Sequence, residues 1–340
     1  MGNVECFIFA MSKIKPPVLE KGGTIGVPAP ASKPSPAGIA VGTERLKKLG
    51  FKVVLGKCSR RTLREGYLAA SDMERADELN GMFRDENIHA IICAGGGYGC
   101  LRIVEHLDYD LIRDHPKIFM GMSDIVTALL AINKMTGLVT FHGPGVLSSA
   151  MSHYTEQSIV RSLTSTDPIG EVRNPPHGPQ IETICPGRVE GELTGGNLDL
   201  VSATLATKYE IDMRGKIFFF EAAGHRTWEI DRFLTHLELT GKLRSAVGFV
   251  AGPMKNVNPA ERAHLEQPSP GAHPDSLLDF SFSSTVEEVL QERLGPIGVP
   301  AIYGVCCGHT EDQTVLPIGV NAEIDGTEGT LKILETAFSH

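Results

Sequence analysis

In the first half of the chain, short apolar runs alternate with segments whose apolar positions recur at helical spacing. The apolar runs predict strands at 24–28, 51–55, 88–93, 117–120 and 138–141, and the helical spacing predicts helices at 42–49, 71–82 and 124–134. Strands that alternate with helices are typical of a parallel sheet covered by helices on both faces. We therefore predict a doubly wound domain, with functional residues at the carboxyl ends of its strands.

The second half repeats this mixture after a proline-rich break. Residues 167–187 have little periodicity and contain five prolines, Pro168, Pro175, Pro176, Pro179 and Pro186, so we predict a linker there. Beyond it, the pattern predicts strands at 217–220, 246–251 and 301–305, a helix at 228–239 and a surface loop at 259–275.

These elements predict an α/β protein with two domains, as the length of 340 residues also suggests. The N-terminal doubly wound parallel-sheet domain is expected at 21–165, after an N-terminal appendage at 1–20. A linker at 166–187 then leads to a C-terminal mixed α/β domain at 188–340. The chain is long enough for both domains to bury a core.

Composition and charge narrow the function classes. Hydrophobic residues make up 41% and charged residues 21%, which is typical of a globular protein. The net charge is −9 and the sequence has no basic stripe with interleaved aromatics, so nucleic acid is not expected as a partner. No apolar run approaches the roughly 20 residues that cross a bilayer, so we expect no membrane partner and a cytoplasmic location. Seven cysteines, an odd number, are a poor disulfide framework and agree with that compartment.

Ser123 follows a predicted strand and a glycine and precedes a predicted helix, in the run Phe119-Met120-Gly121-Met122-Ser123-Asp124-Ile125. A serine at such a turn is exposed at the sheet edge, near helix N-terminal amides that can bind an oxyanion. The run differs from the Gly-x-Ser-x-Gly elbow because Ile125 replaces the second glycine. The alternative is that Ser123 only caps the helix.

A glycine-rich run, Gly95-Gly96-Gly97-Tyr98-Gly99, follows another predicted strand. It fits a phosphate-binding loop, an oxyanion-hole loop or a tight turn. The dinucleotide fingerprint is not matched, because Cys100 stands where its last glycine would fall, and there is no Walker lysine.

Three further residues can take part in acid–base chemistry. Glu221 follows an apolar strand, so its carboxylate needs a buried partner, which is either a histidine or an arginine such as Arg226 or Arg232. His309 lies beside glycines after a predicted strand and is a candidate base, although a surface histidine is the simpler interpretation. His142 ends a strand at the same sheet edge as the serine and is a rival base.

Cys306, Cys307 and His309 lie close together in the sequence, which raises the question of zinc. No second Cys/His pair stands at ligand spacing elsewhere, so no metal site is expected and the thiols are interpreted as buried residues.

Taken together, these segments resemble the LD-carboxypeptidase family of serine peptidases (peptidase family S66), which includes muramoyltetrapeptide carboxypeptidases and microcin C immunity hydrolases. The resemblance runs from near Gly22 to near Leu334, with its motifs in the family's order. The matching segments are Gly23–Pro30, Gly66–Ala69, Ile91–Gly99, Gly121–Leu129, Phe141–Pro144, Gly191–Leu198, Phe220-Glu221, Ile230–Arg232 and Gly308-His309.

The resemblance implies a catalytic triad in which Ser123 is the nucleophile, His309 the general base and Glu221 the carboxylate that orients it. It implies an oxyanion hole made by the backbone amides of Gly97 and Asp124. Asn197 and Arg232 are weaker candidates for placing the substrate or bracing the site. No cofactor is implied.

The family's substrate is murein tetrapeptide, a small peptide whose terminal D-Ala is removed from the L-centre of a diamino acid, and the family implies a homodimer. One alternative is hydrolysis of a peptidyl-nucleotide antibiotic, as in microcin C immunity. Another is a non-catalytic nucleotide-binding α/β protein that uses Gly95–Gly99. Two departures affect the choice of substrate: the family commonly has arginine where Gly95 stands, and Cys306-Cys307-Gly308 precedes His309 where aromatic or apolar residues are expected.

Overall fold

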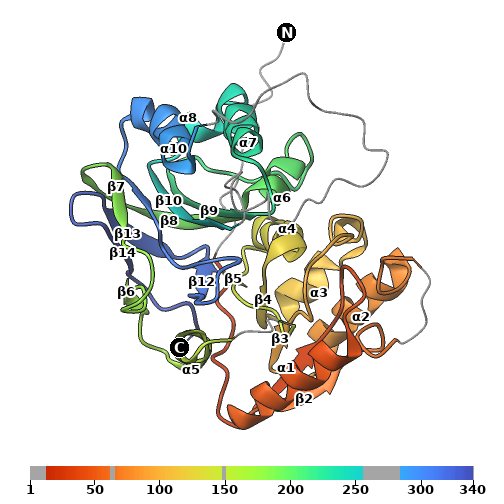
Figure 1. The fold of residues 1–340 in the computed structure, drawn as a ribbon. Helices are drawn as coiled ribbons and strands as arrows, with labels where there is room; N and C mark the ends of the chain where they lie inside the picture. The colour runs from red at the N-terminus through yellow and green to blue at the C-terminus, as the bar shows by residue number, and fades with distance from the viewer. Residues whose placement is uncertain (1–12, 62–65, 148–150, 256–283, 340) are drawn as a thin grey trace, which may run out of the picture.

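The chain folds around two sheets that lie side by side, with helices packed around and between them (Figure 1). A computed structural model describes residues 13–61, 66–147, 151–255 and 284–339. Residues 1–12 of the expected appendage and the expected loop at 259–275 therefore lie outside the described residues. Within the described residues, no helix is long and apolar enough to cross a membrane.

The first sheet confirms the predicted parallel arrangement. Its order is β12-β5-β4-β3-β1-β2, and every strand is parallel to its neighbours except β12, which pairs antiparallel to β5. The strands are β1 (Thr24–Val27), β2 (Lys52–Leu55), β3 (Ala90–Ile92), β4 (Ile118–Gly121), β5 (Thr140–His142) and β12 (Leu316–Ile318). The helices are α1 (Pro36–Lys48), α2 (Asp72–Arg84), α3 (Tyr109–Asp114), α4 (Val126–Thr136) and α5 (His153–Thr164), with 3-10 turns η1 (Val104–His106) and η2 (Ser123–Ile125).

The second sheet belongs to the predicted C-terminal α/β region and mixes parallel and antiparallel strands. Its order is β6-β14-β13-β8-β9-β10-β11-β7, with parallel pairing from β8 to β11 and antiparallel pairing outside. The strands are β6 (Gly170–Val172), β7 (Glu182–Cys185), β8 (Arg188–Asn197), β9 (Lys216–Ala223), β10 (Gly248–Lys255), β11 (Ala301–Tyr303), β13 (Asn321–Asp325) and β14 (Thr330–Ile333). The helices are α6 (Leu198–Ala203), α7 (Thr227–Leu239), α8 (Lys242–Ser245) and α10 (Val286–Leu294), with a 3-10 turn η3 (Gly295–Ile297).

Local sequence explains where helix α2 begins. Ser71 caps α2, because its hydroxyl accepts the Glu74 amide while the Glu74 carboxylate accepts the Ser71 amide.

Helix α4 has buried residues on every side, which is typical of a helix enclosed by the rest of the protein. It contacts β8 and α6 as well as its own sheet, so it lies where the two sheets meet.

Three segments behave differently from the sequence prediction. The proline-rich segment expected as a linker at 166–187 supplies both edge strands of the second sheet, β6 and β7. Strand β12 crosses from the second half of the chain into the first sheet. Of the expected appendage, Ile14 bridges to Leu138 and Leu19 is completely buried. All three depend on pairing with distant residues, which apolar spacing within a segment does not encode.

Candidate active site

Ser123 occupies a strained turn between β4 and α4. Strand β4 ends at Gly121, and Ser123 opens the turn η2 with a φ of 59°, a left-handed conformation that non-glycine residues rarely adopt. Such strain is characteristic of functional sites. A Cβ at Gly121 would lie 2.6 Å from the Ile125 Cγ2 atom. Ile125 therefore fills the space that glycine leaves at 121, and the turn forms without the second glycine of the common elbow.

The glycine-rich loop after β3 lies directly against this turn. A Cβ at Gly96 would be 3.0 Å from both the Ser123 Oγ and the Asp124 backbone nitrogen. The next residue, Gly97, has a φ of +102° that favours glycine. The loop therefore lies against the turn at Ser123 through Gly96, as the oxyanion-hole interpretation requires.

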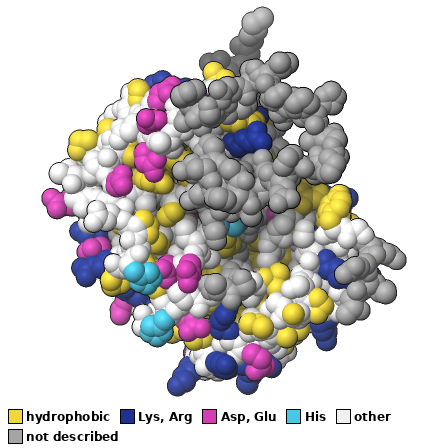
Figure 2. Space-filling model, viewed as in Figure 1, with side chains coloured by type: hydrophobic (Ala, Val, Ile, Leu, Met, Phe, Trp, Pro, Cys, Tyr) yellow, Lys and Arg dark blue, Asp and Glu magenta, His cyan; other side chains and the backbone are white. Residues whose placement is uncertain are grey.

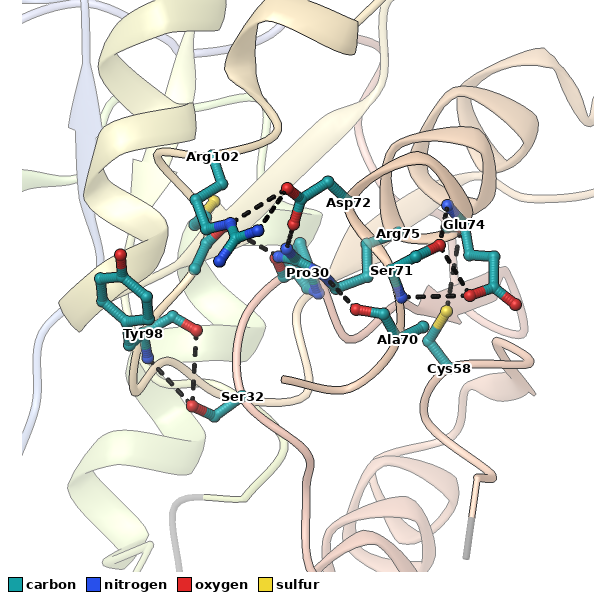
Figure 3. Close-up of polar contacts among 12 residues, drawn as sticks. Pro30, Ser32, Cys58, Ala70, Ser71, Asp72, Glu74, Arg75, Tyr98 and Arg102 are labelled. Carbon is teal, nitrogen blue, oxygen red and sulfur yellow. Dashed lines mark hydrogen bonds and ion pairs between the residues drawn. The ribbon is translucent and has the colours of Figure 1, made fainter. Parts of the chain in front are cut away.

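Two side chains that the sequence analysis did not single out hold this loop (Figure 3). The Ser32 hydroxyl accepts the Tyr98 amide at 3.0 Å and donates to the Tyr98 carbonyl at 3.4 Å. Arg75 is completely buried and donates to the carbonyls of Gly99, at 2.8 Å, and Pro30. Arginine is seldom fully buried, but nothing in a helical pattern shows that position 75 faces two carbonyls.

The side chain of Asp124 ties the loop to the nucleophile turn. Its carboxylate accepts the Cys100 amide at 2.6 Å. Burial raises the pKa of Asp124 to about 6, although the Cys100 amide and the charge of Arg75 lower it. Asp124 thus fixes the glycine-rich loop with its side chain, while its backbone nitrogen faces Gly96 of the same loop.

Glu221 and His309 form a close pair across the second half of the chain. His309 Nδ1 lies 2.8 Å from Glu221 Oε2, and the His309 backbone amide donates to the same oxygen at 3.3 Å. Glu221 is completely buried, whereas the His309 side chain is 27% exposed. Burial raises the pKa of Glu221, but the hydrogen bond and charge of His309, helped by His142 and Asn197, hold it below its ordinary value. Glu221 lies within β9 rather than after it, in register with Asn197 of β8 on one side and at the register shift between β9 and β10 on the other.

The glycine before the histidine makes this pair possible. A Cβ at Gly308 would lie 2.2 Å from the Glu221 Cγ atom, and Gly308 has a φ of +82°. Only glycine allows the loop to cross this closely over the carboxylate. The Gly308-His309 motif therefore has a physical reason in this chain.

His142 lies behind the pair and not at the surface. It is completely buried, its ring meets Phe219 edge to face, and its Nε2 is 3.9 Å from Glu221 Oε1. Burial lowers the pKa of His142 to about 4, so the ring is neutral at pH 7. A neutral histidine without solvent access is poorly placed to exchange protons with a substrate, which favours His309 as the base.

The same histidine links the two halves of the site. His142 is the register partner of Gly121, two residues before Ser123, and it contacts Glu221 from the second sheet. A Cβ at Gly196 would touch the Val126 side chain at 2.7 Å, so the end of β8 packs on the start of α4. These contacts bring the turn at Ser123 and the Glu221–His309 pair to the same junction of the two sheets.

The two weaker candidates differ in position. Asn197 is buried at the end of β8, in register with Glu221, and its amide favours the charged form of that carboxylate. Arg232 lies on α7, where it pairs with Glu229 at 3.6 Å and covers the rings of Trp228 and Phe233. Among the described residues these partners of Arg232 belong to α7, whereas Asn197 lies beside Glu221.

The cysteines before His309 are packing residues. Cys307 is completely buried and contacts Gly252, where a Cβ would meet its sulfur at 2.6 Å. Burial raises the pKa of Cys306 to about 11 and that of Cys307 well above its ordinary value, so both are neutral thiols. Among the described residues, no group of three His, Cys, Asp or Glu side chains is arranged to hold a metal ion.

Comparison with known families agrees with the motif order. The model of the LD-carboxypeptidase N-terminal domain matches residues 25–143, and that of the LD-carboxypeptidase C-terminal domain matches residues 190–324. The chain belongs to the LD-carboxypeptidase family. It is therefore a serine-type carboxypeptidase, a hydrolase.

Relatives within the LD-carboxypeptidase family carry two kinds of name. The probable murein peptide carboxypeptidase of Bacillus subtilis is 38% identical over 325 residues, 94% of each chain. The microcin C7 self-immunity protein MccF of Escherichia coli is 28% identical over 352 residues, covering 94% of this chain and 96% of that protein. A solved structure of MccF with aspartyl sulfamoyl adenosine has a TM-score of 0.83 at 26% identity, covering 96% of this chain and all of that chain.

Proposed function

We propose that this LD-carboxypeptidase removes the terminal D-Ala from murein tetrapeptide and serves cell-wall recycling. The observation that carries the catalytic part is the 2.8 Å contact between the partly exposed His309 and the fully buried Glu221, at the junction where Ser123 turns. The identity of 38% to a probable murein peptide carboxypeptidase supports the substrate. The chemistry needs no cofactor.

In this proposal, Ser123 attacks the scissile carbonyl while His309 accepts its proton through the nitrogen that faces away from Glu221. Glu221 holds the His309 ring by Nδ1 and stabilises the imidazolium that forms. The backbone amides of Gly97 and Asp124 bind the tetrahedral oxyanion. His309 then protonates the leaving D-Ala amine, and a water molecule hydrolyses the acyl-enzyme with the same groups in reversed roles.

One competing substrate has an observation in its favour. The fold and 94% of the chain also match MccF, whose solved complex holds an aspartyl sulfamoyl adenosine. A peptidyl-nucleotide therefore remains the second candidate substrate. We prefer the murein peptide because the identity to the murein-named relative is higher over the same share of the chain, 38% against 28%.

The test is a comparison of three substrates by mass spectrometry. They are murein tetrapeptide, the same peptide ending in L-Ala, and a peptidyl-adenylate phosphoramidate. Release of D-Ala from the first alone is expected, since a misplaced methyl group would misalign the scissile carbonyl of the L-Ala peptide. Cleavage of only the third would assign the protein to antibiotic hydrolysis.

The same assay tests the nucleophile. Ser123→Ala is expected to lower kcat by about 10⁴-fold or more with an unchanged circular dichroism spectrum. A phosphonate probe is expected to label wild type and not the variant. Appreciable turnover or labelling of Ser123→Ala would contradict the triad. A wild-type protein that neither turns over nor reacts with the probe would favour the non-catalytic nucleotide-binding alternative.

The cytoplasmic location and the homodimer belong to this proposal and rest on the family resemblance. The described surface adds one observation. On the face shown in Figure 2, both acidic and basic side chains are present among the described residues.

A further inference from the structure

Two tyrosines are exposed beside the oxyanion loop. Tyr98 directly follows Gly97, and its side chain is 53% exposed, while that of Tyr67 is 62% exposed. Their rings meet edge to face with centroids 5.6 Å apart. A cluster of large exposed aromatic side chains often marks a binding site.

A second feature of this surface is a cluster of two arginines, Arg75 and Arg102, around the carboxylate of Asp72 (Figure 3). Arg102 donates from Nε and Nη2 to one oxygen of Asp72, at 3.0 and 2.8 Å, and the buried Arg75 pairs with the other oxygen. Two guanidinium groups around one carboxylate leave a net charge of +1. The Arg102 side chain is 43% exposed and Asp72 is 26% exposed, so solvent reaches both signs of charge. Both phenol groups lie within electrostatic reach of Arg102.

The scaffold beneath this surface is rigid. Ser32 holds the backbone of Tyr98 on both its N–H and C=O, and Arg75 holds the carbonyl of Gly99. The Tyr98 ring is therefore presented from a loop whose backbone is already fixed for the oxyanion hole. A ligand that used this ring would lose little conformational entropy of the protein on binding.

We propose that Tyr67, Tyr98 and Arg102 form a subsite for the substrate residue that contributes the scissile carbonyl. The subsite binds the tip of that residue's side chain when the tip carries an ammonium beside a carboxylate. The inference rests on the proposed function, in which the scissile carbonyl belongs to the L-centre of a diamino acid. The carboxylate of the substrate side chain binds the guanidinium of Arg102, whose planar N–H donors match the two oxygens of a carboxylate. The ammonium lies against the tyrosine faces and next to Asp72, where cation–π and charge attraction act together.

The experiment uses four tetrapeptides that differ only at the third residue. That residue is meso-diaminopimelate, its form amidated at the distal carboxylate, lysine, or norleucine. Arg102→Gln is expected to lower kcat/KM about tenfold for the diaminopimelate peptide, to the value of the amidated peptide. For the lysine and norleucine peptides, kcat/KM is expected to change less than about twofold in Arg102→Gln, because these side chains present no carboxylate to position 102.

Position 98 offers a matched pair of variants. Tyr98→Phe keeps the ring, whereas Tyr98→Ala removes it without touching the backbone atoms that Ser32 holds. Only Tyr98→Ala is expected to lower kcat/KM, about three- to tenfold, and only for the three peptides with an ammonium. Arg244→Gln, another half-exposed arginine in an ion pair, serves as the charge control and is expected to change nothing.

The outcomes separate the two hypotheses. An equal loss on all four peptides would show that Arg102 acts through the loop and would overturn the subsite, as would no loss on any. If wild type releases D-Ala from none of the four, the proposed function is itself wrong, and the subsite falls with it. A loss confined to the diaminopimelate peptide in Arg102→Gln is the result that supports the inference.

Discussion

Gly96→Ala places one methyl group inside the catalytic junction and so tests the geometry of the site directly. Its Cβ would lie 2.8 Å from the Ser123 Cβ and 3.0 Å from both the Ser123 Oγ and the Asp124 nitrogen. Carbon contacts need about 3.5 Å or more, so the loop or the nucleophile turn must move. Gly96 is outside the left-handed region, so the backbone itself accepts alanine without strain.

The expected loss follows from what the methyl group displaces. It would block the approach of an oxyanion to the Asp124 amide and press on the Ser123 side chain. Removing one oxyanion donor typically costs about 10² to 10³ in kcat. We therefore expect kcat/KM to fall by about 10²- to 10³-fold, mostly through kcat, because the substrate's remaining contacts are kept. Stability should fall by only about 1–3 kcal/mol, as for other overpacked sites.

The assay is steady-state release of D-Ala, combined with urea unfolding of the same preparations. Gly81→Ala is the matched control, because a Cβ at that position in α2 meets nothing within 4 Å. It should raise stability by about 0.5–1 kcal/mol and leave turnover unchanged. A folded Gly96→Ala enzyme with kcat/KM within about threefold of wild type would refute the oxyanion assignment of this loop.

Two further predictions concern the histidines and acid. His309→Ala should lower kcat far more than His142→Ala, because His142 is buried, and the opposite order would make His142 the base. Stability should fall as the pH drops from about 6.5 to 4: the pKa of His142 is about 4 in the fold against 6.5 outside it, so the unfolded chain binds more protons in that window. The lowered pKa of Glu221 continues the loss below its ordinary value of 4.5, as that carboxylate is protonated. Urea midpoints measured from pH 7.5 to 4 check this, and an equally steep decline in His142→Gln would contradict the His142 contribution.

The sequence by itself determined the local parts of this protein. The alternation of apolar runs and helical spacing predicted the parallel core of the first sheet, because each such strand and helix is encoded within its own segment. The turn that carries Ser123 after Gly121 was visible for the same reason. The family resemblance implied catalytic roles for Glu221 and His309, which the residues alone left open between a catalytic pair and separate surface or salt-bridge roles.

The tertiary structure decided everything that depends on distant partners. Glu221 and His309 are 88 residues apart, and their contact exists because Gly308 lets one loop cross the buried carboxylate. The burial of His142 likewise follows from the second sheet covering the edge of the first. The segment expected as a linker forms two edge strands, because its backbone groups pair with those of β14 and β11. Such pairing satisfies backbone N–H and C=O groups that would otherwise lack partners. Such choices are made by the partner strand, so they cannot be found in the periodicity of the segment itself.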